Sequence, residues 1–179
     1  YGDRLAAAVR SVLNVPMDPL SPELYTAYSE VDLNYGRPLP TKEELLQIVD
    51  ESSGKALYLR QRANILVNQL NDGIAFSSYY PYPVQIWRIG EQNIVTLGGE
   101  VVVDYALELK DIYGEDLFVM AYSNEMVGYV PSERVLQEGG YEANRSSING
   151  VVIDIPWASG TETRIIQQIR DLADEVGIE

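Results

Sequence analysis

The strongest constraint on the fold is a run of alternating patterns between residues 83 and 122. Two strand-like segments, PVQIWRIG and QNIVTLGG, are joined by a turn at Gly90–Glu91. The pair Gly98–Gly99 ends the second segment, and helical spacing follows from Val102 to Tyr113. Leu117–Tyr122 then predicts another short, buried strand. Because strands and helices alternate here, we expect an α/β fold in which helices cover a mixed sheet, with α+β as the alternative.

Further elements are predicted on both sides of this run. Helical spacing favours helices over residues 3–13, 55–70 and 160–176, and residues 24–33 are typical of a strand. Thr41 with Glu44 three residues later has the pattern of a reciprocal capping box, so a helix is expected through Val49. Gly54 is expected to interrupt it, and the aromatic stretch SSYYPYP to form a turn-prone surface loop.

The apolar positions of the terminal helices repeat at three- and four-residue steps. Thr161 or Thr163 is the expected cap of the last helix. The predicted stripe of the first helix is Leu5, Ala8, Val9, Val12 and Leu13, and that of the last helix is Ile165, Ile166, Ile169, Leu172, Ala173 and Val176. Without a linker sequence between these elements, residues 1–179 are predicted to form a single unit.

Composition disfavours several classes of function. The formal charge of -14 repels nucleic-acid phosphates and anionic lipid surfaces. Apolar runs such as IVTL fall far short of the roughly 20 residues that span a bilayer, so no transmembrane segment is predicted. Histidine and cysteine are both absent from the sequence. The chain therefore lacks the two side chains that most often bind catalytic zinc. The sequence also does not begin with methionine, which is what a processed or excised fragment would show.

Glu100 directly follows the glycine pair and is predicted to open a helix. A carboxylate at that position is stabilised by free main-chain N–H groups and the helix dipole, so one interpretation is a purely structural cap. The other is a functional acid at the end of a strand, where open α/β sheets bind ligands. The Gly-Gly-Glu motif alone is compatible with both.

A resemblance bears on this choice. The segments RIGEQNIVTLGGE and AYSNEMVGYVPSERVLQEGGYE occur in the order and with the spacing seen near the end of the catalytic domain of the neutral, non-lysosomal ceramidases. The chain resembles this family best over residues 83–142. The resemblance implies that Glu100 and Tyr129, which lies five residues after Asn124, are zinc ligands. It also implies that Tyr141 contacts the carbonyl or oxyanion of the substrate.

Zinc in the intact enzyme is thus implied, with two histidine ligands from an N-terminal portion outside this chain. The resemblance further implies a ceramide-like N-acyl lipid substrate, a secreted or periplasmic location, and no immunoglobulin-like domain in these residues. Phenol titrates near pH 10, so Tyr129 is expected to bind metal only where other ligands already hold it. We therefore expect the chain alone to bind little zinc and to be inactive.

The sequence departs from the family pattern around the glutamate. Gly98 stands where the family has proline, and Val101–Val102 replace a phenylalanine followed by threonine or serine. None of the nearby serines has a histidine base, so no nucleophile is assigned. The alternative function is a binding or interaction module that keeps the fold without catalysis, with Glu100 as a helix cap.

Overall fold

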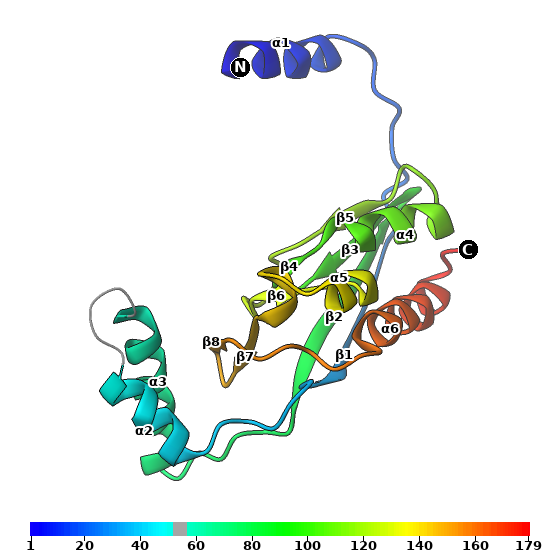
Figure 1. Cartoon of the computed structure of the whole chain (residues 1–179). Coiled ribbons are helices and arrows are strands. Elements are labelled where there is room, and N and C mark those ends of the chain that lie inside the picture. The colour runs from blue at the N-terminus through cyan, green and yellow to red at the C-terminus, as the bar shows by residue number, and fades with distance from the viewer. Residues whose placement is uncertain (52–56) are drawn as a thin grey trace.

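The computed structural model describes residues 1–51 and 57–179 (Figure 1). Its centre is a four-stranded sheet in the order β1-β2-β3-β5, formed by β1 (Leu24–Asn34), β2 (Tyr79–Ile89), β3 (Gln92–Leu97) and β5 (Phe118–Met120). The first three strands are antiparallel neighbours, and β5 runs parallel to β3. The sheet is therefore mixed, and together with its helices it forms an α/β structure as the sequence predicts.

The predicted hairpin at Gly90–Glu91 is present, with Ile89 paired to Gln92. Its first strand is longer than expected, because residues 79–82 continue β2 instead of forming a surface loop. Their main chain pairs with β1, with Tyr82 opposite Val31 and Tyr80 opposite Leu33. The prediction of a turn-prone loop here was wrong: aromatic residues suit a strand once a partner strand is available.

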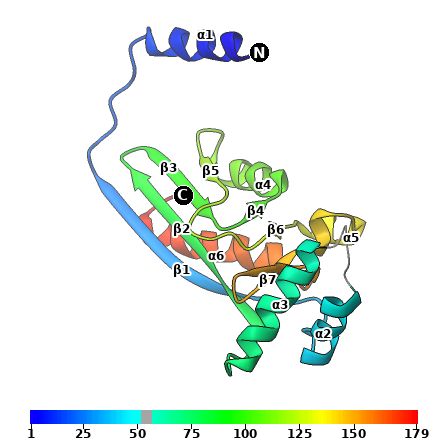
Figure 2. The ribbon, with the colours of Figure 1, turned by 90° about the vertical axis from the view of Figure 1, so that its left-hand side faces the viewer.

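The last helix, α6 (Thr161–Val176), packs against β1 and β2 (Figure 2). All six residues of its predicted apolar stripe are buried. The predicted threonine cap was wrong, because the N-cap is Gly160 with φ 88°. Thr161 is instead buried, and its hydroxyl donates to the carbonyl of Ala158 at 2.8 Å.

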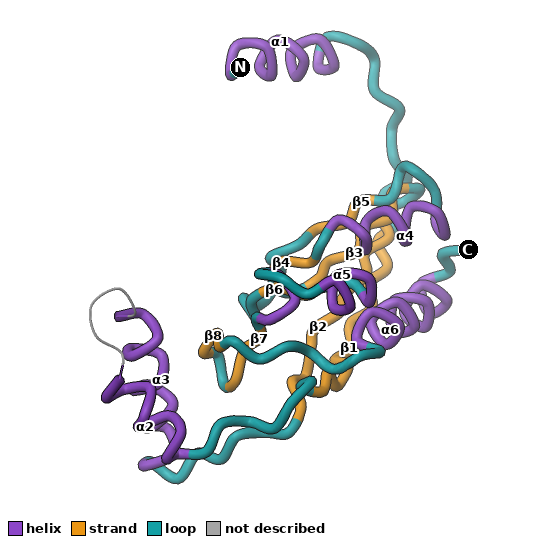
Figure 3. Tube along the Cα trace, viewed as in Figure 1, coloured by secondary structure: helices purple, strands orange, loops and turns teal. Residues whose placement is uncertain are grey.

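Several short elements follow β3 in the sequence (Figure 3). They are β4 (Glu100–Val101), α4 (Val103–Tyr113), β6 (Tyr129–Val130), α5 (Glu133–Glu138), the 3₁₀ turn η2 (Glu142–Asn144), β7 (Ser146–Ile148) and β8 (Val151–Ile153). The β5 strand was predicted to be buried, but Phe118 is 59% exposed and Met120 47% exposed. Among the described strands, β5 lies at the edge of the sheet and pairs with β3.

A second, smaller core joins α2 (Lys42–Glu51) and α3 (Leu57–Asn71) to the β7–β8 hairpin. The capping box is confirmed: Glu44 accepts from the Thr41 main-chain N at 2.7 Å, and the Glu44 N donates to the Thr41 hydroxyl at 3.2 Å. Gly54 and the predicted first residues of the next helix lie outside the described residues. Through this second core the helical hairpin contacts β8.

The first helix, α1 (Gly2–Leu13), matches its predicted bounds but stands apart from the sheet in both views (Figures 1 and 2). None of its residues is buried, and Leu5 is 71% exposed. Its predicted apolar stripe therefore faces outward. No described helix is long and apolar enough to cross a membrane.

Candidate functional site

Glu100 and Tyr129 are neighbours in the structure. They are directly paired in the parallel strands β4 and β6, although they lie 29 positions apart in the sequence. The Glu100 N donates to the carbonyl of Gly128 at 2.8 Å, and the Val102 N donates to that of Val130 at 3.2 Å. Because paired positions of neighbouring strands project to the same face of a sheet, both side chains lie on one side of this ribbon.

The turn that delivers Glu100 requires glycine. Gly99 has φ 64°, and a Cβ there would lie 2.6 Å from Val127 Cγ2 and 2.7 Å from the Gly128 carbonyl oxygen. The preceding carbonyl, that of Gly98, accepts a 2.7 Å hydrogen bond from the buried hydroxyl of Tyr82. The backbone before Glu100 is thus fixed both by close packing and by a bond from the core.

Tyr129 is tied to the core through its main chain. The indole Nε1 of Trp157 donates to the Tyr129 carbonyl at 2.8 Å. Trp157 is 2% exposed and stacks on Tyr35 with ring centroids 5.6 Å apart. A stacked pair, one ring buried and the other half-buried, therefore helps to position β6.

Tyr141 joins the same cluster from the turn after α5. Its ring meets that of Tyr129 edge to face, with centroids 5.4 Å apart. The Arg145 guanidinium lies 4.1 Å from the centroid of the Tyr141 ring and 3.7 Å from the carboxylate of Asp154. Tyr141 is 56% exposed. Its ring is thus held between Tyr129 and Arg145 on an accessible surface.

The electrostatics centre on the Glu100 carboxylate. The pKa of Tyr129 is raised, first by desolvation and second by its interaction with the negative charge of Glu100. A hydrogen bond to Glu100 is the main cause that raises the pKa of Tyr122. Both phenols therefore stay protonated at neutral pH.

Tyr122 is the residue that sequence reasoning missed. It has φ 57°, a left-handed conformation uncommon for a tyrosine, and its main-chain N donates to the Gly99 carbonyl at 2.8 Å. The only signal in the sequence is its place in the AYSN segment after β5. Nothing in that pattern indicates that the chain turns back toward Glu100.

Glu100 does not open the helix. It lies in β4, and the N-cap of α4 is Val102. The acidic residue of the first turn is Asp104, whose carboxylate binds Arg134 at 3.0 Å. The structural cap considered for Glu100 is therefore wrong, and Glu100 pairs instead with Tyr129 of β6.

The serines near this cluster cap a helix, lie buried or contact the main chain. Ser132 is the N-cap of α5, accepting from the Val135 N at 3.3 Å and donating to Asp104. Ser146 and Ser147 are buried. The Ser123 hydroxyl donates to the main-chain carbonyls of Met120 at 3.5 Å and Ala121 at 3.4 Å. These surroundings suit packing and capping.

Glu100 and Tyr129 place two oxygen-bearing side chains on one face of the β4–β6 ribbon. Glu100 supplies a carboxylate and Tyr129 a phenol, both of which can act as oxygen ligands. Within residues 1–51 and 57–179, no group of three or more His, Cys, Asp and Glu side chains is placed to hold a metal ion. Two ligands are fewer than the three protein ligands of an ordinary catalytic zinc.

Comparisons with known proteins give little further information. No protein-family profile matches the chain, and no curated protein matches it. A solved structure described as "Ceramidase complexed with C2" is similar to it, with 14% identity and a TM-score of 0.44. The match covers 88% of this chain but 31% of the ceramidase chain, so this chain spans about a third of that protein's length.

Proposed function

We propose that this chain is the C-terminal portion of a zinc-dependent amide hydrolase that acts on ceramide-like N-acyl lipids. The observation that carries the proposal is the pairing of Glu100 with Tyr129 on adjacent strands. These are the two residues that the resemblance of the sequence implies as metal ligands. Tyr141, the implied substrate contact, lies against the ring of Tyr129. Three residues chosen from sequence motifs thus share one surface.

Each side chain has a role in this proposal. Glu100 and Tyr129 would hold the zinc together with two histidines from an N-terminal portion of the protein. When bound, zinc polarises a carbonyl or lowers the pKa of a water molecule. Tyr129 has to release its proton to bind, and this is unfavourable for the chain alone because its pKa is raised. The missing ligands therefore make the site dependent on the other portion.

Tyr141 would bind the substrate. Its exposed phenol can donate a hydrogen bond to the oxygen that becomes negative as the amide carbonyl is attacked. The ring of Tyr129 and the guanidinium of Arg145 orient it. In the overall reaction the amide C–N bond breaks, the acyl group takes the hydroxyl of water, and the amine takes the proton.

The test uses the whole gene product. The reading frame that precedes Tyr1 should encode two histidines and a serine of the hydrolase. In that protein Glu100→Gln and Tyr129→Phe should each abolish release of fatty acid from an N-acylsphingosine, and Tyr141→Phe should lower kcat. Glu108→Gln, on the exposed side of α4, is the matched control and should retain activity.

Metal binding gives an independent measurement. Calorimetry of the isolated chain should detect little zinc uptake, since two oxygen ligands make a weak site. Tight stoichiometric uptake by the isolated chain would contradict the shared site. An intact protein with no hydrolase activity and normal folding would instead favour the non-catalytic binding module.

A further inference from the structure

One face of the central sheet carries exposed apolar side chains. Successive residues of a strand point to opposite faces, and Ala27 and Ile86 point into the core that contains the buried residues of α6. On the other face, Trp87, Ile94 and Phe118 are paired neighbours on β2, β3 and β5 and form a row. Most of the surface around this row is accessible. This surface, the open face, consists of Trp87, Ile94 and Phe118 with the exposed residues Leu24, Tyr28 and Met120.

The helix α1 carries a second exposed apolar surface. Its stripe includes Leu5, Val9 and Val12, and none of the residues of α1 is buried. A helix of 12 residues is at the lower limit of stability in water when it stands alone. Helices of this length are normally stabilised by packing of their apolar side. The stripe of α1 therefore calls for a partner surface.

The stripe and the open face match in size and in charge. At 1.5 Å per residue α1 is about 18 Å long, and four strands spaced about 4.8 Å apart make a face about 14 Å across. Arg4 and Arg10 flank the stripe on its two sides, and Asp3 is the acidic residue of the helix. The four described strands of the sheet place Glu30 and Asp32, and no basic side chain, on the open face. Opposite charges thus favour contact between the helix and this face.

The linker between α1 and β1 directs the helix away from its own sheet. The Ser21 N donates to the Glu91 carboxylate at 3.2 Å, and the Gly90 N donates to the Glu23 carbonyl at 2.8 Å. The linker is thus attached at the β2–β3 turn, and from there it leaves the sheet (Figure 1). Proline fixes φ and favours an extended chain, which opposes folding back. The prolines of the linker are Pro16, Pro19 and Pro22.

We propose that the chain forms a symmetric dimer in which α1 of each copy packs on the open face of the other copy. A reciprocal exchange of this kind closes the assembly at two chains. It covers both exposed apolar surfaces of each copy, because each surface is the partner of the other. The proposal does not depend on the amide hydrolase function, and it concerns residues outside the Glu100 cluster.

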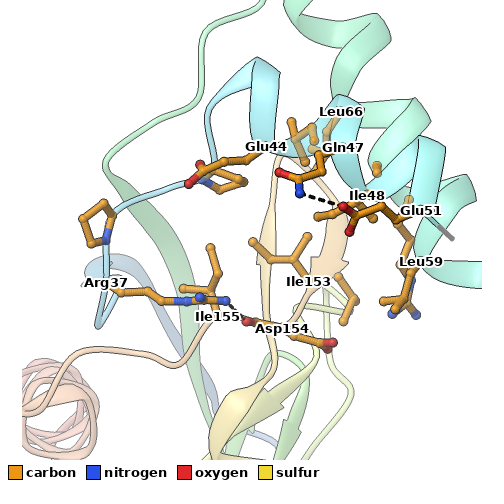
Figure 4. Close-up of a pocket in the computed structure, with 16 residues that line it drawn as sticks. Arg37, Glu44, Gln47, Ile48, Glu51, Leu59, Leu66, Ile153, Asp154 and Ile155 are labelled. Carbon is orange, nitrogen blue, oxygen red and sulfur yellow. Dashed lines mark hydrogen bonds between the residues drawn. The ribbon is translucent and has the colours of Figure 1, made fainter. Parts of the chain in front are cut away.

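A cavity between α2, α3 and β8 is a different apolar surface of the chain (Figure 4). Its volume is about 550 Å³, and Leu45, Ile48 and Ile153 are among its lining residues. A helix about 18 Å long and 10 Å wide occupies more than about twice that volume. The cavity therefore does not accommodate α1, and a substitution there serves as a control.

Sedimentation equilibrium of the purified chain over a concentration series measures the dimer dissociation constant. Val9→Asp in the stripe and Phe118→Asp on the open face should each raise this constant at least about tenfold, because each places a charge in the apolar contact. Ala7→Asp is the matched control on the opposite side of α1, and Ile48→Asp is the control at the cavity. Both controls should dimerise as the wild type does. Circular dichroism verifies that each variant is folded.

Cross-linking identifies which surfaces meet. The sequence contains no cysteine, so introduced thiols react without background. A chain with Val9→Cys is mixed with a chain that carries Phe118→Cys, and a short bis-maleimide is added. We expect a covalent dimer of the two different chains, and a much lower yield when Ala7→Cys replaces Val9→Cys.

Four results would overturn the proposal. They are a monomer at every concentration, a wild-type dissociation constant in either Val9→Asp or Phe118→Asp, equal cross-linking yields from Val9→Cys and Ala7→Cys, and cross-linking of Val9→Cys to Phe118→Cys within one doubly substituted chain. The last result would place α1 on its own sheet. Glu100→Gln should leave the dissociation constant unchanged, so a failure of the hydrolase proposal is distinguishable from a failure of this one.

Discussion

Replacing Tyr82 with phenylalanine tests the link between the core and the Glu100 turn. Tyr82 is 0% exposed, and its hydroxyl donates to the Gly98 carbonyl at 2.7 Å. Burial raises the pKa of Tyr82 well above its ordinary value, so the hydroxyl remains a donor throughout the usual pH range. The substitution keeps the ring and removes this one donor, leaving a carbonyl without a partner in the core.

The expected loss of folding stability comes from the Gly98 carbonyl, which is left without a hydrogen-bond donor. A buried polar group that loses its partner costs about 1–3 kcal/mol. For a chain of this size, a loss of about 2 kcal/mol lowers the Tm by roughly 4–8 °C. Urea unfolding followed by circular dichroism measures the free energy of unfolding. Hydrogen exchange at the Glu100 amide, which donates to Gly128, should also accelerate because the turn before it loosens.

Tyr105→Phe is the matched control. Tyr105 is also 0% exposed, but its hydroxyl donates to the Pro131 carbonyl at the longer distance of 3.2 Å. The weaker bond predicts a smaller loss, about 1 kcal/mol. If Tyr82→Phe costs no more than Tyr105→Phe, or leaves exchange at Glu100 unchanged, the hydrogen bond to Gly98 does not hold the turn.

Three further substitutions test separate features. Gly99→Ala combines positive φ with contacts below 3 Å and should cost more than about 1 kcal/mol in urea unfolding, and more than Gly114→Ala, where φ is also positive but the space is open. Arg134 lowers the pKa of Asp104, so their pairing stabilises the fold above the ordinary carboxylate pKa and is lost as pH falls through the lowered value. The stabilities of wild type and Asp104→Asn, measured against pH, should therefore differ by less than about 1 kcal/mol at pH 7 and converge as the pH falls through the lowered pKa of Asp104. Ile169→Ala, at a fully buried position of α6, should cost about 2–5 kcal/mol in the same urea assay.

Much of the secondary structure was predictable because its causes are local. The capping box at Thr41 depends on residues three positions apart, and the hairpin depends on its turn. The predictions that were wrong depend on contacts between residues far apart in the sequence. Residues 79–82 form a strand only because β1 lies beside them, and Gly160 replaces a threonine cap because the Thr161 side chain is buried instead.

The candidate site was predictable only in part. Motif resemblance selected Glu100, Tyr129 and Tyr141, and the structure places them on one surface. Their roles in zinc binding and catalysis stay predictions. Tyr122 could not have been found, because its approach to Glu100 depends on the path of a loop with φ 57°.

The two terminal helices explain why periodicity alone does not predict burial. Both α1 and α6 have apolar residues at helical spacing, and both were predicted from that pattern. The stripe of α6 is buried because β1 and β2 provide a matching apolar surface, whereas the stripe of α1 packs against no element of the described residues and is exposed. Burial is thus a property of two surfaces, and a sequence pattern describes one of them. The position of Glu100 also depends on a second segment. Its neighbours in sequence suggested a helix cap, but Glu100 pairs with Tyr129 of β6, and the N-cap of α4 is Val102.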